Sequence, residues 1–248
     1  MIKLRPIQFT DVILERDSRW TWKLLALQAG SLNMFGYLSA HHFVSHITSF
    51  ASNFALSFHK NDFFEAFVFL VIPLFFLSGS FFTGVFTEVR RKRKLSPHYI
   101  VPLGFSAVLL SFIYLMSFFK FWSTFGRTTT DSKDLFILLI LCFCMGMQNA
   151  LFTTVSGGII RTTHLTGLTT DLGIELAENL FLRKKILSSR NRFRLGSILF
   201  FLIGAFGGTY LYTNWQFHGL LFNIATSLLL GIYFYQHRVA QSQFNSEA

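Results

Sequence analysis

Six long apolar segments restrict what this chain can fold into. They lie at residues 22–40, 64–87, 99–119, 135–155, 194–213 and 217–235. Each approaches the roughly 20 residues that a helix needs to cross a bilayer. Only 14% of the 248 residues are charged, which is too few to cover the surface of a soluble domain. None of the segments alternates like a barrel strand, so we expect an all-α, polytopic membrane protein with six transmembrane helices.

Basic residues indicate which ends of these segments face the cytoplasm, because Lys and Arg are retained on that side. With six spans, the basic-rich stretches 90–94 and 183–194 fall on the same side as both chain termini. The opposite side receives only Lys60, Lys120, Arg127 and Lys133. We therefore expect cytoplasmic tails at 1–21 and 236–248. The net charge of +10 then reflects topology and contact with anionic membrane lipids, and no nucleic-acid partner is needed to explain it.

A sequence motif occurs twice in the chain. Residues 46–53, His-Ile-Thr-Ser-Phe-Ala-Ser-Asn, return as residues 164–171, His-Leu-Thr-Gly-Leu-Thr-Thr-Asp. Each copy follows an apolar segment that contains an asparagine, Asn33 in the first case and Asn149 in the second. Matching chemistry at nearly every position indicates an internal duplication.

The duplication extends beyond one helix, because Phe-Leu-Ser-Gly at 76–79 returns as Phe-Leu-Ile-Gly at 201–204. Each copy holds three apolar segments, at about 22–119 and about 135–235. Three is an odd number, so the second copy enters the membrane from the opposite side. We therefore expect one membrane domain over residues 1–248, built from two inverted three-helix repeats. Many secondary transporters share this plan and place their substrate site near the midplane, where broken helices meet.

The matched motifs follow places where a continuous helix is not expected. Residues 24–58 are too long for one ordinary crossing at 1.5 Å per residue, so this stretch must bend, break or lie along the surface. In the second copy, glycines at 157–158 and Gly167 permit a sharp turn. Apolar and acidic residues then recur at helical spacing, which predicts a short helix that starts near Thr166.

The polar residues of these motifs have two interpretations. Threonine and aspartate are typical of a helix N-terminus, where they accept hydrogen bonds from free backbone N–H groups. Alternatively, they form a polar site for a small solute, in which Asp171, unlike its counterpart Asn53, could couple to a proton or cation. Polar residues within the spans should face the bundle interior. The candidate ligand-binding residues are Asn33, Thr48, Asn53, Gln148, Asn149, Arg161, Thr166, Gly167, Thr170 and Asp171.

Small residues in the second and fifth segments predict close approach of helices, either to each other or to a dimer partner. These residues are Gly79, Ser80, Gly84, Gly204 and Gly208. We expect no metal site, because no carboxylate or thiolate accompanies the two histidines at helical spacing, His42 and His46.

The second motif resembles that of a known family. It comprises Met-Gly-Met-Gln-Asn-Ala at 145–150, Gly-Gly at 157–158, Arg-Thr-Thr at 161–163 and Thr-Gly-Leu-Thr-Thr-Asp-Leu-Gly at 166–173. With these residues the chain resembles the YoaK-like family of uncharacterised bacterial inner-membrane proteins, which carry the domain of unknown function 1275. The resemblance covers most of the length. It implies six helices and location in the cell inner (plasma) membrane, and it names no substrate.

Two functions stay open at this point. One is a small-solute transporter or permease with a polar site between the inverted repeats. The alternative is a non-transporting structural or regulatory membrane protein that binds lipid or a protein partner, and either could form a homo-oligomer. An enzyme is not expected, because the sequence has no nucleophile elbow, HExxH motif or Gly-rich phosphate loop. Nothing in it calls for a cofactor.

Overall fold

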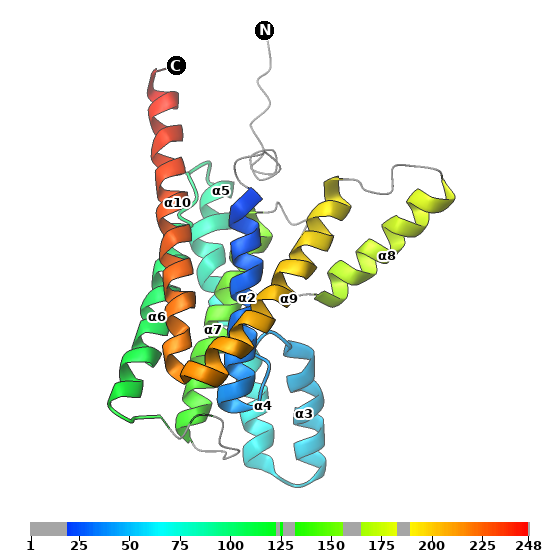
Figure 1. Cartoon of the computed structure of the whole chain (residues 1–248), viewed down its shortest axis with the longest axis vertical. Coiled ribbons are helices and arrows are strands. Elements are labelled where there is room, and N and C mark those ends of the chain that lie inside the picture. Colours follow the sequence, from blue (N-terminus) through cyan, green and yellow to red (C-terminus); the bar gives the residue numbers. More distant parts are fainter. Residues whose placement is uncertain (1–18, 123–124, 126–131, 156–164, 183–188, 248) are drawn as a thin grey trace.

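The described part of the protein is entirely helical. The structure, a computed structural model, describes residues 19–122, 125, 132–155, 165–182 and 189–247. Over those residues every regular element is a helix (Figure 1). In chain order they are α2 Arg19–Ala40, α3 Ile47–His59, α4 Phe63–Gly84, the π-helical η1 Val85–Val89, α5 Arg90–Lys92, α6 Ile100–Phe118, α7 Ser132–Val155, α8 Leu165–Phe181, α9 Ser189–Trp215, the 3₁₀ helix η2 Gln216–Gly219 and α10 Leu220–Glu247. The all-α prediction is confirmed, and each of the six apolar segments is helical.

Four stretches of the described chain are long and apolar enough to cross a membrane. They are Phe63–Lys92, Ile100–Phe118, Leu135–Thr154 and Asn191–Gln236. The fourth reverses direction at η2, so that α9 runs toward the lower end of the molecule in Figure 1 and α10 returns to the upper end. A left-handed backbone at Gln216, with φ of 46°, begins this reversal.

The outer surface of the bundle also indicates a lipid environment. Large apolar side chains on α4 are more than half exposed, among them Phe67, Leu74, Leu77 and Phe81. A soluble monomer rarely exposes so large a contiguous apolar surface. Hydrocarbon tails would cover these side chains without cost, so the helices are those of a membrane protein.

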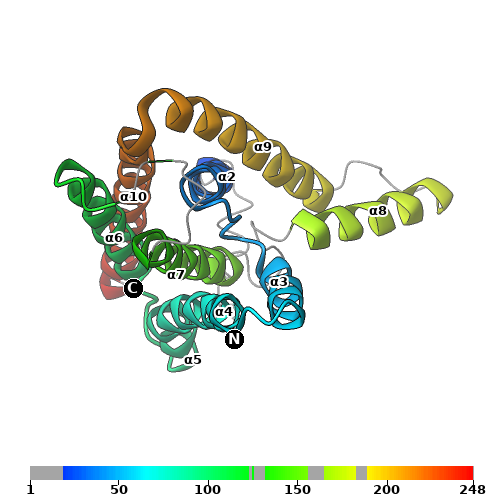
Figure 2. The same ribbon diagram turned by 90° about the horizontal axis from the view of Figure 1, so that it is seen from below.

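α2 lies between α9 and α7, with α10 beside it (Figure 2). The most extensive contacts pair α2 with α9, α4 with α7, and α6 with α10. In Figure 1, α2, α6 and α9 run from the upper end to the lower end, whereas α4, α7 and α10 run the opposite way. α6 and α10 are therefore antiparallel, whereas α2 and α9 both descend and α4 and α7 both ascend.

Residues 24–58, which are too many for one membrane crossing, do not form one helix, because the helix breaks after Ala40. The chain turns back beside α2 before α3 begins, as Figure 1 shows. This turn is held by Asn33, whose Oδ1 accepts hydrogen bonds from the backbone N–H of Ser45 at 3.1 Å and from its hydroxyl at 2.9 Å. Val44 packs so closely on Gly36 that a Cβ there would lie 2.5 Å from a Val44 methyl carbon. The sequence alone left three alternatives, and a break is the one that the structure has.

The second short helix, α8, follows α7 in the chain as α3 follows α2. It begins at Leu165, next to the predicted start at Thr166, and rises away from the bundle in Figure 1. Ile47, the first residue of α3, and Leu165, the first residue of α8, both pack against the same buried cluster. Both short helices therefore begin against the core. α3 then continues along α4, with Phe50 fully buried, whereas α8 extends outward.

Candidate polar site in the helical bundle

Glycines bring α2 into backbone contact with α9. A Cβ on Gly30 would overlap the carbonyl oxygen of Phe201 and lie 2.8 Å from the backbone nitrogen of Ala205. A Cβ on Gly204 would overlap the carbonyl oxygen of Leu27 and lie 2.6 Å from its carbonyl carbon. Real Cβ atoms essentially never come this close to backbone atoms, so this crossing requires glycine on both helices.

The crossing of α4 and α7 is built in the same way. A Cβ on Gly146 would lie 2.9 Å from the carbonyl carbon of Phe76, and one on Gly79 would lie 2.9 Å from that of Phe143. Gly146 stands three residues before Asn149, just as Gly30 stands three residues before Asn33. The sequence motifs singled out Gly79 and Gly204 but missed Gly30 and Gly146, although their shared spacing from the two asparagines was a usable signal.

The other small residues differ in their roles. Ser80 Oγ donates to the carbonyl oxygen of Gly146 at 3.0 Å, and a Cβ on Gly208 would lie 2.8 Å from Ser31 Cα. Both therefore belong to the crossings. A Cβ on Gly84, by contrast, would meet nothing within 4 Å. The expected pairing of the second and fifth segments with each other is replaced by pairing of α4 with α7 and of α9 with α2.

A network of buried amides joins α2 to α7 and α10. Gln148 Nε2 donates to the carbonyl oxygen of Leu25 at 2.9 Å and to Gln28 Oε1 at 3.2 Å. Gln28 Nε2 in turn donates to the carbonyl oxygen of Asn223 at 2.8 Å and to Ser227 Oγ at 2.6 Å. Sequence analysis predicted that Gln148 faces the interior but missed Gln28 and the two α10 residues.

The same network continues to α9 through two hydroxyls. Asn223 Nδ2 donates to Ser31 Oγ at 3.2 Å and to the hydroxyl of Tyr212. Those two hydroxyls also share a hydrogen bond of 3.1 Å. Tyr212 and Asn223 are completely buried. One connected set of uncharged polar side chains therefore links four helices inside the bundle.

The two asparagines of the duplicated motif are both buried. Asn33 holds the turn before α3, as described above. Asn149 Oδ1 is buried and accepts no hydrogen bond from the residues that the structure describes. In sequence, Thr163 precedes His164 as Ser45 precedes His46, but Thr163 and the candidate residue Arg161 lie outside the described residues.

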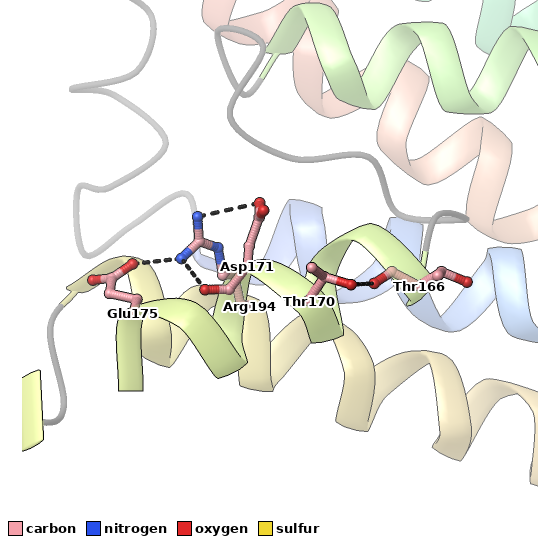
Figure 3. Close-up of polar contacts among 5 residues, drawn as sticks. All are labelled: Thr166, Thr170, Asp171, Glu175 and Arg194. Atoms are coloured by element: carbon pink, nitrogen blue, oxygen red, sulfur yellow. Dashed lines mark hydrogen bonds and ion pairs between the residues drawn. The ribbon is translucent and has the colours of Figure 1, made fainter. Parts of the chain in front are cut away.

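The candidate residues on the short helices are less buried. Thr48, Thr166, Gly167 and Thr170 are exposed, and Asn53 is half-buried. Thr170 Oγ1 donates to the carbonyl oxygen of Thr166 at 2.9 Å within α8 (Figure 3). No side chain caps α3, whose N-cap residue is His46. The structure thus separates a buried amide group in the core from an exposed polar edge on α3 and α8.

Asp171 forms part of an ion-pair cluster between α8 and α9 (Figure 3). The Arg194 guanidinium bonds to Glu175 through Nη1 and lies 3.3 Å from Asp171 Oδ2 through Nη2. Nη1 also approaches the backbone carbonyl of Asp171 at 3.4 Å. The side chain of Arg194 is 11% exposed, that of Glu175 is 21% and that of Asp171 is 51%. We name Asp171, Glu175 and Arg194 the α8 clamp.

The histidines near the end of α2 pack on aromatic rings. The ring of His42 lies 5.9 Å from that of Phe50 and 5.4 Å from that of Phe69. Within the described ranges, no three His, Cys, Asp or Glu side chains gather as a metal-binding group.

Comparison with known proteins identifies one family. The family model described as "Protein of unknown function (DUF1275)" matches residues 22–233. This match agrees with the resemblance to the YoaK-like proteins. Neither the curated proteins nor the solved structures contain a match to this chain.

Proposed function

The chain belongs to the family described as "Protein of unknown function (DUF1275)", and we propose that it moves a small solute across the inner membrane through a polar site between two inverted three-helix repeats. The observation that carries this proposal is the matched pair of short helices. Both α3 and α8 begin with a residue that packs on one buried cluster, Ile47 and Leu165 respectively. Two short helices that each begin against the core of a bundle resemble the broken helices that form binding sites in secondary transporters.

Helix directions and crossings support the inverted arrangement. In Figure 1 each helix of the first half runs opposite to its counterpart in the second: α2 against α7, α4 against α9, and α6 against α10. The glycines of the two crossings also correspond pairwise, Gly30 with Gly146 and Gly79 with Gly204. A two-fold axis in the membrane plane would produce both relationships.

The four apolar stretches give six membrane spans when α9 and α10 each cross the membrane separately and α2 crosses it as well. Each of these helices exceeds 20 residues. α2 carries buried polar residues, among them Gln28, Ser31 and Asn33, because other helices enclose it and lipid does not. This explains why its apolar character is weaker than that of the other spans.

The orientation that we propose places both termini in the cytoplasm. Basic residues gather where α5, Arg90–Lys92, and the first turns of α9 lie, at the upper end of Figure 1. Lys60 and Lys120 directly follow α3 and α6, which end at the lower end. The more basic end is the cytoplasmic one.

The solute would bind where α3 and α8 begin. The N-terminus of a helix has free N–H groups and a partial positive charge, which favour anionic or strongly polar groups. Thr48, Asn53, Thr166 and Thr170 supply a polar edge on these helices. Arg161, which precedes α8 in sequence, would add a positive charge.

A second candidate function is a scaffold that transports nothing. The specific observation in its favour is that the amides of Gln28 and Gln148 bond to each other and to neighbouring helices. Such bonds strengthen helix packing in membranes and need no ligand. The two functions differ in whether water reaches the beginnings of α3 and α8.

Cysteine labelling tests the proposal. Thr48→Cys and Thr166→Cys are introduced one at a time, and a membrane-impermeant maleimide is added to sealed vesicles of either orientation. A transporter should show labelling of both positions from both faces, at different rates. Leu77→Cys is the matched control, because Leu77 is exposed on α4, within a span that the proposal places in lipid, and it should not react. Protection of both test positions from both faces would favour the scaffold.

Solute flux gives the functional readout. Reconstituted protein is tested by light scattering for osmotic uptake of a panel of small neutral, anionic and cationic solutes. Thr166→Val and Asp171→Asn should lower uptake of whichever solute is moved, whereas Thr213→Val should not. Thr213 is exposed, and the hydrogen bonds described for its hydroxyl stay within α9. Uptake that is unchanged in the first two variants would remove them from the mechanism.

A further inference from the structure

Two amide oxygens of the network are not matched by a donor in the described part of the chain. All six amide N–H groups of Gln28, Gln148 and Asn223 already have acceptors, two for each NH₂ group. Gln148 Oε1 and Asn223 Oδ1, both fully buried, accept no hydrogen bond from the described part of the chain. A buried acceptor left unpaired costs about 1–3 kcal/mol, so the network is a place where a ligand would gain binding energy.

The orientation of the two glutamines is fixed by the backbone. Gln28 Nε2 faces the carbonyl oxygen of Asn223, and Gln148 Nε2 faces that of Leu25. Turning either amide over would place two oxygens against each other. Gln28 Oε1 accepts one bond, from Gln148, and an amide oxygen can accept two. Gln148 and Gln28 therefore both direct acceptor capacity into the interior.

None of the hydrogen bonds described for Gln28, Ser31, Gln148, Asn223 or Ser227 involves a carboxylate, Lys or Arg. The network is therefore electrically neutral and rich in oxygen. Ca²⁺ and Mg²⁺ are normally held by at least one carboxylate, so a divalent ion does not fit. Neutral oxygens can replace the hydration shell of a monovalent cation, as carbonyl groups do in ion-selective pores.

We propose that the side-chain oxygens of Gln28 and Gln148 form part of a binding site for a monovalent cation between α2, α7 and α10. Na⁺, K⁺ and NH₄⁺ share the required chemistry. The evidence for this site is the amide network alone. If the proposed transport function holds, the site also deepens it, because a cation bound in the core could couple to solute movement.

Thermal unfolding of the purified protein in detergent tests this site. Tm is measured in sodium, potassium, ammonium and choline chloride at equal ionic strength, since choline is too large for the site. A cation at about ten times its Kd should raise Tm by about 3–6 °C over choline. The salt that gives the largest rise identifies the ion. Equal Tm in all four salts would overturn the proposal.

Two variants at one position assign the effect to the network. Gln148→Met removes the oxygen and should abolish the difference between the salts. Gln148→Glu keeps the side-chain shape and adds negative charge, but it replaces the Nε2 donor with an oxygen that faces the Leu25 carbonyl and Gln28 Oε1. It should therefore lower Tm in choline, increase the cation-dependent rise and let Ca²⁺ raise Tm as well. If Gln148→Met does not fold, Gln148→Glu decides alone, and an unchanged salt pattern in it would overturn the site.

The matched control is Thr83→Val. Thr83 is fully buried and donates to the carbonyl oxygen of Met147 at 3.1 Å, in the crossing of α4 and α7. Its loss should lower Tm equally in all four salts. Because no solute flux is measured, a scaffold that transports nothing can still show the cation effect, and a transporter can lack it.

Discussion

Asn33 and Ser45 form a two-bond link across the break between α2 and α3: the asparagine Oδ1 accepts both the N–H and the hydroxyl of Ser45. Without Asn33 Oδ1, the N–H and the hydroxyl of Ser45 would have no acceptor, and leaving a buried donor unpaired costs about 1–3 kcal/mol. We expect Asn33→Ala to lower Tm in detergent and to increase amide exchange at residues 41–46. Ser45→Ala is the graded control, because it loses only the hydroxyl bond and should have a smaller effect. Equal loss in the two variants would contradict this account.

Glycines within α9 should differ sharply in their tolerance of alanine. A Cβ on Gly204 overlaps the backbone of Leu27, whereas a Cβ on Gly207 meets nothing within 4 Å. Overpacking costs about 1–3 kcal/mol, so Gly204→Ala should lower Tm by several degrees. Gly207→Ala should leave Tm unchanged or raise it, because alanine is the better helix former. The crossing would be misassigned if Gly207→Ala were the more damaging change.

The α8 clamp should hold α8 against α9. A hydrogen bond to a charged group contributes about 1.5 kcal/mol or more, which corresponds to about tenfold in an opening equilibrium. We therefore expect Glu175→Gln to speed hydrogen exchange in residues 165–181 by about tenfold. Asp171→Asn should have a smaller effect, because Asp171 is more exposed and more distant from Arg194. The reverse order would show that Asp171 is the principal partner.

Single cysteines should report opposite sides of the membrane for the two ends of the bundle. Lys92→Cys lies at the basic end of the bundle, and Lys60→Cys and Lys120→Cys lie at the opposite end. We expect an impermeant maleimide to label Lys92→Cys only from the cytoplasmic side and the other two only from the outside. Labelling of all three from the same side would rule out the six-span arrangement.

The native cysteines should not interfere with such labelling. Cys142 and Cys144 are both completely buried in α7, and a maleimide must reach the sulfur to react. We expect no modification of the folded wild-type protein and modification of both residues after unfolding in SDS, measured by mass. Rapid labelling of the folded protein would mean that α7 is more accessible than its packing shows.

Much of the helical architecture was predictable because helices in lipid have length and composition requirements. The segment expected at 135–155 is α7, Ser132–Val155, and the short helix expected near Thr166 begins at Leu165. The break after Ala40 was one of three alternatives, since composition cannot show which way a chain turns. Its cause, the link from Asn33 to Ser45, depends on a contact between residues twelve apart.

The amide network was largely beyond prediction. A single Gln or Asn in an apolar segment shows that it needs a partner, but not which helix supplies it. Gln28, Tyr212 and Asn223 meet only because α2 lies among α7, α9 and α10. Gly84 illustrates the converse, since a small residue at the correct spacing has the same sequence signature whether or not a neighbouring helix approaches it.

The two glycine crossings have a mechanical consequence. Each one joins a helix of the first half to a helix of the second, α2 to α9 and α4 to α7, through close backbone contacts. If the protein changes shape, we expect α2 to move together with α9 and α4 together with α7. It would then open between these two pairs, each of which contains one helix from either half of the sequence.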